Sequence, residues 1–206
     1  MPWGDITRVD RSEEMMAKVI AVDSRFRVAR RLCKLGTSWP WNVAYVNKKK
    51  YLTAYTNGQV LLWDDTLPDA RKIDIFNFEY VTEGSQPPER LSSVIPKTKG
   101  RRLKIPEDFY KFARAIKDDR SLLTIGPEGI TVKEMYSAEE LALHYTEGPV
   151  NAYEICFDPR VFMLLKPSCL RVRKDKGKPA TVESSYNETI DGFETVLMMP
   201  NGGNND

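Results

Sequence analysis

The sequence has little of the chemistry that metal sites and most enzymes use. It has one histidine, His144, and the three cysteines, Cys33, Cys156 and Cys169, form no C-x-x-C pair. This spacing argues against a common zinc site and a disulfide framework, and it favours a reducing compartment. No apolar run approaches the roughly 20 residues that a membrane-spanning helix needs. The stretch MPWGDITRVDRSEEMM has no signal-peptide pattern. We therefore expect a cytoplasmic protein with no membrane contact.

Candidate catalytic groups are equally few. His144 lies in LALHYTEG, where alternation predicts a strand, and Cys156 lies in the apolar AYEICFDP, which favours a buried thiol. GKPAT lacks the phosphate-loop pattern. The acidic pairs fall at predicted element ends, where solvated caps and turns explain them: Asp64/Asp65, Asp118/Asp119 and Glu139/Glu140. We expect no catalytic residue, no metal and no cofactor, and an enzyme is a distant third interpretation.

The remaining composition is that of a globular protein. Hydrophobic residues make up 41% of the 206 residues, and 31 basic residues against 29 acidic ones leave a net charge of only +2. This length favours two domains of about 100 residues each. We place them at 1–97 and 98–206. Because the net charge is nearly balanced, the distribution of charge says more about a partner than its sum.

The second domain repeats one order of elements. A strand at 101–106, a helix from Glu107 to about Lys117, a hairpin and a third strand are followed by the same order again. In the second copy Asp158 caps a helix with Pro159 at its first position, and Pro167 ends it. The predicted strands lie at 101–106, 121–126, 129–135, 141–147, 151–157, 169–174, 180–184 and 193–199. Two copies of a strand-helix-three-strands unit predict an α+β domain with an internal duplication.

The first domain has a similar pattern. A strand at 17–22 precedes a helix that Asp23 or Ser24 caps and that runs to about Leu35. Strands are predicted at 41–46, 49–56, 59–64 and 72–81. Asn57-Gly58 suits a type I′ hairpin turn, which needs positive φ at both central residues.

The first helix separates apolar from basic side chains. At 100° per residue, one side collects Val28, Ala29, Leu32 and Leu35. The opposite sector collects Arg27, Arg30, Arg31 and Lys34. The later helix repeats this plan more weakly, with Lys111, Arg114 and Lys117 away from Phe109, Phe112, Ala113 and Ile116. Clustered cations suit contact with phosphates without base reading. The alternative is two amphipathic helices with solvated outer faces.

Several segments resemble the DNA sliding clamps, the β-subunit type of bacterial polymerase. EGSQPPERLSSVIP resembles that family's joint between its second and third domains, and LTAYTNGQVLLW resembles a hairpin of its second domain. The third-domain matches follow in the family's order: LKIPEDFYKFARAI, GITVKEM, NAYEICFDPRVFMLLK, LRVRKDKGKPATVES and FETVLMMP.

The resemblance implies a ring-forming clamp fold whose helices line a hole around double-stranded DNA, without sequence preference. It implies a processivity factor that tethers a DNA polymerase and is placed on DNA by a clamp loader. Bacterial clamps have three domains and close as dimers, so a two-domain chain is expected to form a homotrimer like small phage-type clamps, with a dimer as the alternative. The runner-up function is a clamp-derived protein that binds a replication factor without encircling DNA.

The resemblance also implies an apolar pocket for partner peptides beside the joint. Carried over residue by residue, the pocket comprises Gly58, Leu61, Pro96, Val182, Leu197, Met199 and Pro200. The family's hairpin arginine is Val60 here, and Asn201-Gly202-Gly203 replaces its terminal residues. For Leu61, Val182 and Leu197 the strong alternative is a core position, which they would occupy in any such sheet. A pocket of altered specificity, or no pocket, stays open.

Overall fold

The structure is a computed structural model of the whole chain. It describes residues 24–35, 42–47, 51–64, 70–76, 81, 93–98, 100–113, 122–126, 129–133, 140–144, 154–173 and 177–200. The predicted strand at 17–22 lies outside these residues.

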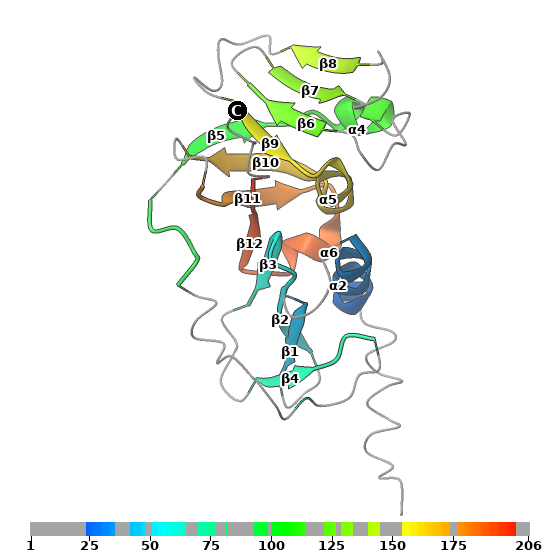
Figure 1. Cartoon of the computed structure of the whole chain (residues 1–206), viewed down its shortest axis with the longest axis vertical. Coiled ribbons are helices and arrows are strands. Elements are labelled where there is room, and N and C mark those ends of the chain that lie inside the picture. The colour runs from blue at the N-terminus through cyan, green and yellow to red at the C-terminus, as the bar shows by residue number, and fades with distance from the viewer. Residues whose placement is uncertain are drawn as a thin grey trace, which may run out of the picture.

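A large antiparallel sheet runs through both halves of the chain (Figure 1). It has eight strands in the order β4-β1-β2-β3-β12-β11-β10-β5. The strands of the first half are β1 (Val43–Val46), β2 (Leu52–Thr56), β3 (Val60–Trp63) and β4 (Arg71–Ile73). The strands of the second half are β5 (Arg101–Lys104), β10 (Pro167–Val172), β11 (Ala180–Ser185) and β12 (Thr195–Met198). The two halves therefore share one sheet.

A second sheet of four strands has the order β8-β7-β6-β9. Its strands are β6 (Leu122–Ile125), β7 (Gly129–Lys133), β8 (Glu140–His144) and β9 (Ile155–Phe157). The helices are α2 (Ser24–Leu35), α4 (Glu107–Ala113), α5 (Pro159–Leu165) and the short α6 (Glu188–Asp191). The predicted duplication is confirmed: β5-α4-β6-β7-β8 is followed by β9-α5-β10-β11-β12. The first strand of each unit pairs with a strand of the other unit: β5 of the first unit pairs with β10, and β9 of the second unit pairs with β6.

The two halves meet at the antiparallel pair β3–β12. Leu61 lies opposite Leu197, and Leu62 lies opposite Val196. On either side of this pair the order is the same, because β2, β1 and β4 mirror β11, β10 and β5. Helix α2 precedes β1 as α5 precedes β10, and α2 contacts both α5 and α6. The helices therefore gather on one face of the continuous sheet (Figure 1).

The main core lies under these helices. It joins the stripe of α2 to the inner faces of both sheets and to α4 and α5. The ring centroids of Phe109 and Phe162 are 6.0 Å apart, and Tyr110 stacks on Phe162 at the same distance. The hydroxyl of the buried Tyr110 donates to the carbonyl of Pro167 at 2.6 Å. Buried aromatic contacts of this kind fix how α4 packs on α5.

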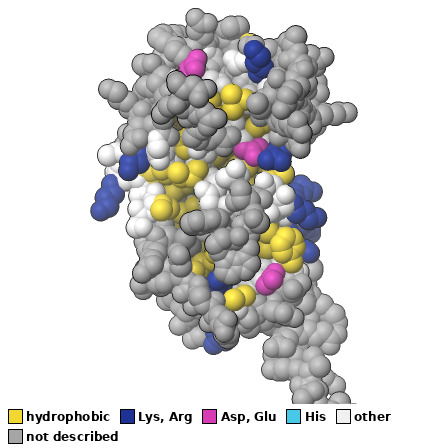
Figure 2. Space-filling view, in the orientation of Figure 1, with side chains coloured by type: hydrophobic (Ala, Val, Ile, Leu, Met, Phe, Trp, Pro, Cys, Tyr) yellow, Lys and Arg dark blue, Asp and Glu magenta, His cyan; other side chains and the backbone are white. Residues whose placement is uncertain are grey.

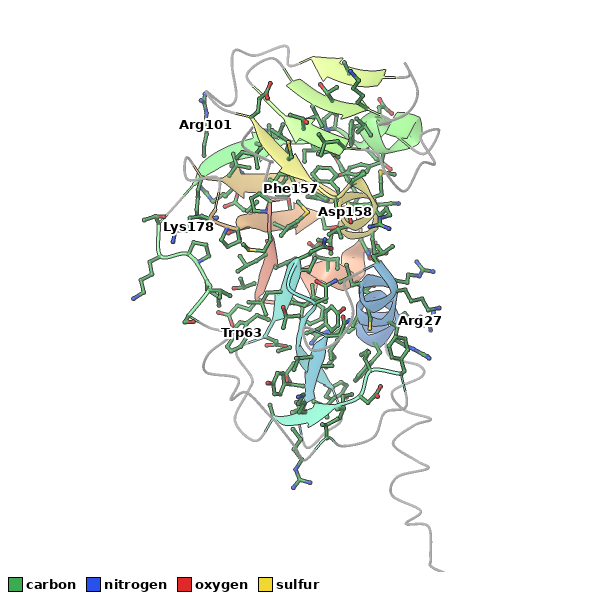
Figure 3. All side chains as sticks on the ribbon, in the orientation of Figure 1. Arg27, Trp63, Arg101, Phe157, Asp158 and Lys178 are labelled. Atoms are coloured by element: carbon green, nitrogen blue, oxygen red, sulfur yellow. The ribbon has the colours of Figure 1, made fainter. Side chains whose placement is uncertain are left out.

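Helix α5 forms as its sequence predicts. The Asp158 carboxylate accepts a hydrogen bond from the Arg160 backbone N–H at 2.8 Å, and Pro159 occupies the first turn. Lys166 ends the helix in the left-handed region, at φ 45°, directly before Pro167. Figure 3 shows Asp158 at the end of β9, next to Phe157.

The structure corrects the sequence analysis at three local points. The Asn57-Gly58 hairpin exists, but it is not type I′, because Gly58 (φ 83°) is its one described residue with positive φ. The Asn57 side chain supplies the missing constraint, since its Oδ1 accepts from the backbone N–H groups of Gln59 and Val60. The strand predicted at 72–81 ends at Ile73, where Asp74 Oδ1 accepts from the Phe76 N–H and turns the chain. The third concerns α6, which was not predicted and which Asn187 caps.

Candidate functional site

The basic face predicted on α2 is exposed. Arg27, Arg31 and Lys34 are exposed and Arg30 is half-buried, while Val28, Ala29 and Leu32 are buried. Figure 3 shows Arg27 pointing away from the helix, and Figure 2 shows Lys and Arg side chains along the same margin of the molecule. The helical period therefore separated the two faces correctly. Contact of these side chains with DNA stays a prediction.

Arg25, which the sequence did not single out, anchors this helix to both halves. Its guanidinium donates to the Asp64 carboxylate at 3.1 Å and to the Leu52 carbonyl at 3.3 Å. It also donates to the Gly192 carbonyl at 2.5 Å and lies over the Phe193 ring, 4.9 Å from the centroid. At the other end of α2, buried Asn57 donates to the Leu32 carbonyl at 3.1 Å. The orientation of the basic face is thus fixed by contacts that periodicity cannot show.

The second predicted basic face is weaker. The Lys111 ammonium lies 2.7 Å from the Asp108 carboxylate on α4, and both side chains are exposed. The pKa of Lys111 is raised, first by the hydrogen bond to Asp108 and then by that carboxylate's charge. Lys111 is therefore partly neutralised by its own helix. Arg114 and Lys117 lie outside the described residues.

A hollow of about 580 Å³ is lined by residues of α2, α5 and α6 on the helix-covered face. Arg31 and Lys166 line it together with the polar side chains of Asn187 and Thr189 and with Glu188. The sequence analysis did not single out Lys166. Its position at a helix C-terminus directly before a proline could have indicated a cation at the end of α5. Lys166 therefore adds a cation from the end of α5 beside Arg31 of the basic face of α2.

Two of the predicted pocket residues belong to an apolar cluster on the opposite face of the sheet, and binding of a partner there stays a prediction. Leu61 and Leu197 pair across the junction and belong to a small cluster that is separate from the main core. Its buried members are Tyr45, Ala54, Leu61, Trp63 and Leu197, with Val43, Ala70 and Ile95 packed against them. Leu61 is 4% exposed and Leu197 is 1% exposed. The side chains of Leu61 and Leu197 are therefore almost fully buried.

Four of the predicted pocket residues are more accessible than the buried cluster. Gly58 is exposed, and Pro96, Met199 and Pro200 are half-buried. The Met199 N–H donates to the Gln59 carbonyl at 2.7 Å, which extends the β12–β3 pairing beyond Met198. Ile95 packs on the cluster, so the joint, the hairpin and the end of β12 meet as the resemblance implied.

Val182 does not belong to this group. It lies opposite Val196, and both are part of the main core beneath the helices. Thr181 lies opposite Leu197 and is therefore the β11 residue on the pocket's face. Because successive strand residues point to opposite faces, a one-residue offset moved the prediction to the wrong side.

The potential metal ligands and the cysteines are a separate feature of the described residues. No group of three or more potential metal ligands occurs among them, and the three cysteines are free thiols. Burial raises the pKa of the Cys33 and Cys169 thiols. Cys156 is half-buried in β9, beside Thr124 Oγ1 at 3.6 Å. Among the described helices, none is long and apolar enough to cross a membrane.

No protein-family model matches the sequence, and neither does any curated protein. Solved structures do match the fold. The Helicobacter pylori beta clamp bound to a DNA ligase peptide is 11% identical, with a TM-score of 0.54 over 87% of this chain and 64% of that one. DNA polymerase III subunit beta from Borrelia burgdorferi is 12% identical, with a TM-score of 0.54 over 87% and 62%. The sliding clamp of Bartonella birtlesii bound to griselimycin is 16% identical, with a TM-score of 0.55 over 90% and 64%.

The chain has the sliding-clamp fold. The resemblance drawn from the sequence is thereby confirmed at the level of the fold. The chain spans 62–64% of the length of these clamps. In this fold the basic face of α2 lies on the helix-covered side of the sheet, and the apolar cluster lies on the other side.

Proposed function

We propose that the protein is a sliding-clamp-like processivity factor: several copies close a ring around duplex DNA and tether a DNA polymerase, with no catalysis of their own. The observation that carries this proposal is the junction at β3–β12. It continues one sheet across both halves and leaves α2, α5 and α6 on one face (Figure 1). That face presents the exposed cations of α2.

A ring changes what its lining must do. Topology holds the protein on DNA, so the lining needs only weak, sequence-independent attraction to phosphates. Arg27, Arg30, Arg31 and Lys34 provide this attraction, with a smaller contribution from Lys111 because of Asp108. We include Arg114 and Lys117 in this lining on the resemblance alone.

We propose two domains in each copy, 1–97 and 98–206, and closure of the ring by association of copies. Cyclic closure needs a head-to-tail interface between different surfaces. In the described residues β4 ends the large sheet on the side of the first half, and β8 ends the small sheet of the second half. Pairing of such edges between copies would continue the sheets around the ring. We propose three copies, loaded onto DNA by a clamp loader.

The test is retention on circular DNA. The protein is loaded on nicked circular DNA, and retention is measured before and after the circle is cut once. An encircling ring slides off the linear product, whereas a protein that only binds the backbone stays bound to both forms. The charge-reversing double variant R31E/K34E should lose retention, and the loss should diminish as salt rises.

The matched control is Lys133→Glu, which reverses an exposed cation on β7, in the other sheet. If cutting the circle changes nothing, the protein does not encircle DNA. A strictly monomeric native mass in the presence of DNA would favour the runner-up, a clamp-derived protein that binds a replication factor.

A further inference from the structure

The sheet face opposite the helices carries an unusual set of charges on β5, β10 and β11. On these strands Leu103, Leu170 and Val172 point into the main core, so their neighbours in sequence point outward. The outward side chains include three cations of the strands, Arg102, Lys104 and Arg171, and a fourth cation, Arg173, directly follows β10. Among the described residues of the three strands, Glu183 is the only acid. We name these four cations, with the exposed flanking Lys97 and Lys178, the outer basic face.

Glu183 shows how this face holds a carboxylate. It accepts a hydrogen bond from Arg171 and forms an ion pair with Arg102 at 2.9 Å. Burial alone would raise the pKa of Glu183, but the hydrogen bonds and charges of its partners, Arg171 foremost, hold that pKa below its usual range. The carboxylate of Glu183 thus forms ion pairs with two of the four cations, Arg102 and Arg171.

Among the described residues, the side chain of Arg173 donates hydrogen bonds to uncharged acceptors. Its guanidinium donates to the carbonyls of Thr98 and Pro179, at 3.1 Å and 2.5 Å, and to Thr181 Oγ1 at 3.0 Å. Burial, and then repulsion by Arg171, lower its pKa. These contacts fix the side chain without supplying a negative charge. A positive charge is therefore held in place between the joint and the β10–β11 turn.

The outer basic face lies beside the apolar cluster of the junction. Thr181 pairs with Leu197, and Leu197 pairs with Leu61, so one row of side chains runs from Arg171 to the cluster. Figure 2 shows cationic side chains at the margin opposite α2, and Figure 3 shows Arg101 and Lys178 pointing away from the sheet there. Cations and apolar anchors therefore share one surface.

We propose that the outer basic face docks an acidic segment of a partner protein. Three guanidinium groups suit carboxylates, since arginine makes bidentate contacts with them. A single-stranded nucleic acid fits less well, because such sites interleave cations with aromatic stacking platforms. The described residues of β5, β10 and β11 include no aromatic side chain. Apolar residues of the same partner, next to its acidic segment, would then contact the apolar cluster at the junction.

The experiment measures binding of a short labelled peptide of alternating glutamate and serine to the full chain by fluorescence anisotropy. The comparison probes are the same peptide with glutamine for glutamate and an oligothymidylate of equal length. We expect the glutamate peptide to bind, with an affinity that falls as salt rises. Neither comparison probe should match it.

The variants K104E and K178E each reverse one exposed cation of this face, and Lys133→Glu on β7 is the matched control. K104E/K178E should weaken peptide binding about tenfold, as expected for the loss of two exposed ion pairs and added repulsion. K133E should bind as the parent does. An equal loss with K133E, or tighter binding of the oligothymidylate, would overturn the proposal.

This inference does not depend on encirclement of DNA. If circular DNA is not retained but K104E/K178E still weakens binding of the glutamate peptide, the proposed function fails and the docking face stands. If circular DNA is retained and the glutamate peptide does not bind, the docking face fails alone.

Discussion

Gly100 lies at the start of β5, where the joint enters the sheet. A Cβ at this position would lie 2.4 Å from the carbonyl oxygen of Val172 on β10, a neighbour that is backbone and cannot rotate away. Its own carbonyl accepts a hydrogen bond from Arg171 at 3.2 Å. Gly100 is therefore needed for the close approach of β5 to β10.

We expect Gly100→Ala to lower the free energy of unfolding by about 1–3 kcal/mol, because β5 must shift away from β10. Urea denaturation measures this change. Gly126→Ala is the control, since its Cβ would meet only the Glu154 side chain, at 3.6 Å. Equal stability of the two variants would show that β5 moves without cost.

At the level of elements, Arg25 connects α2 to strands of the first half and to the loop before β12 in the second. Arg25→Met keeps an apolar stem but removes three donated hydrogen bonds, one of which forms the ion pair with Asp64. We expect a loss of about 2 kcal/mol in unfolding free energy, because hydrogen bonds from charged groups are strong. The exposed Lys34→Met should change it by less than about 0.5 kcal/mol. Equal urea midpoints for the two variants would contradict this role of Arg25.

Glu183 connects β11 to β5 and β10 through Arg102 and Arg171, which predicts a dependence of stability on pH. Its pKa is lower in the folded state, so its contribution is present above the usual carboxyl pKa and is lost as pH falls through the folded value. The parent should therefore be more stable than Glu183→Gln near pH 7, by less than about 1 kcal/mol because the pair is partly exposed.

This difference should shrink as pH falls below the usual carboxyl pKa and disappear below the lower folded-state pKa, where both chains carry an uncharged side chain at 183. Thermal unfolding at several pH values measures it, with the exposed Glu154→Gln as control. A difference that stays constant across this range would mean that the charge of Glu183 does not stabilise the sheet.

At the level of the whole molecule, the joint, the hairpin and the end of β12 meet on the face opposite the basic helix. If a flexible partner segment docks there, half-buried Met199 offers it an apolar contact, and a thioether adapts to different ligands. Met199→Glu should then abolish stimulation of the polymerase in primer extension without changing the native mass. Leu122→Glu is the control, because Leu122 is 39% exposed on the other sheet. Normal stimulation by a folded Met199→Glu protein would limit the role of this segment to structure.

The sequence by itself determined the elements whose signals are local. The two faces of α2 follow from the 3.6-residue period, and α5 follows from an Asp158 cap, a proline in the first turn and a proline at the end. The repeated unit of the second half could be predicted because its strands are bounded by turn residues, which are also local signals. The error at 72–81 was also local, since one Asp74 side chain outweighed the alternation.

Only the tertiary structure decided which faces of these elements meet. The β3–β12 pair joins segments far apart in the sequence, and its register sets which residues lie beside the joint. A shift of one residue reverses every side chain of a strand, and β10 has irregular register on both sides of Cys169. Val182 was therefore placed on the wrong face, and neither Arg25 nor the outer basic face could be predicted. Periodicity shows that a strand has two faces, but the long-range hydrogen bonds of the sheet decide what each face contacts.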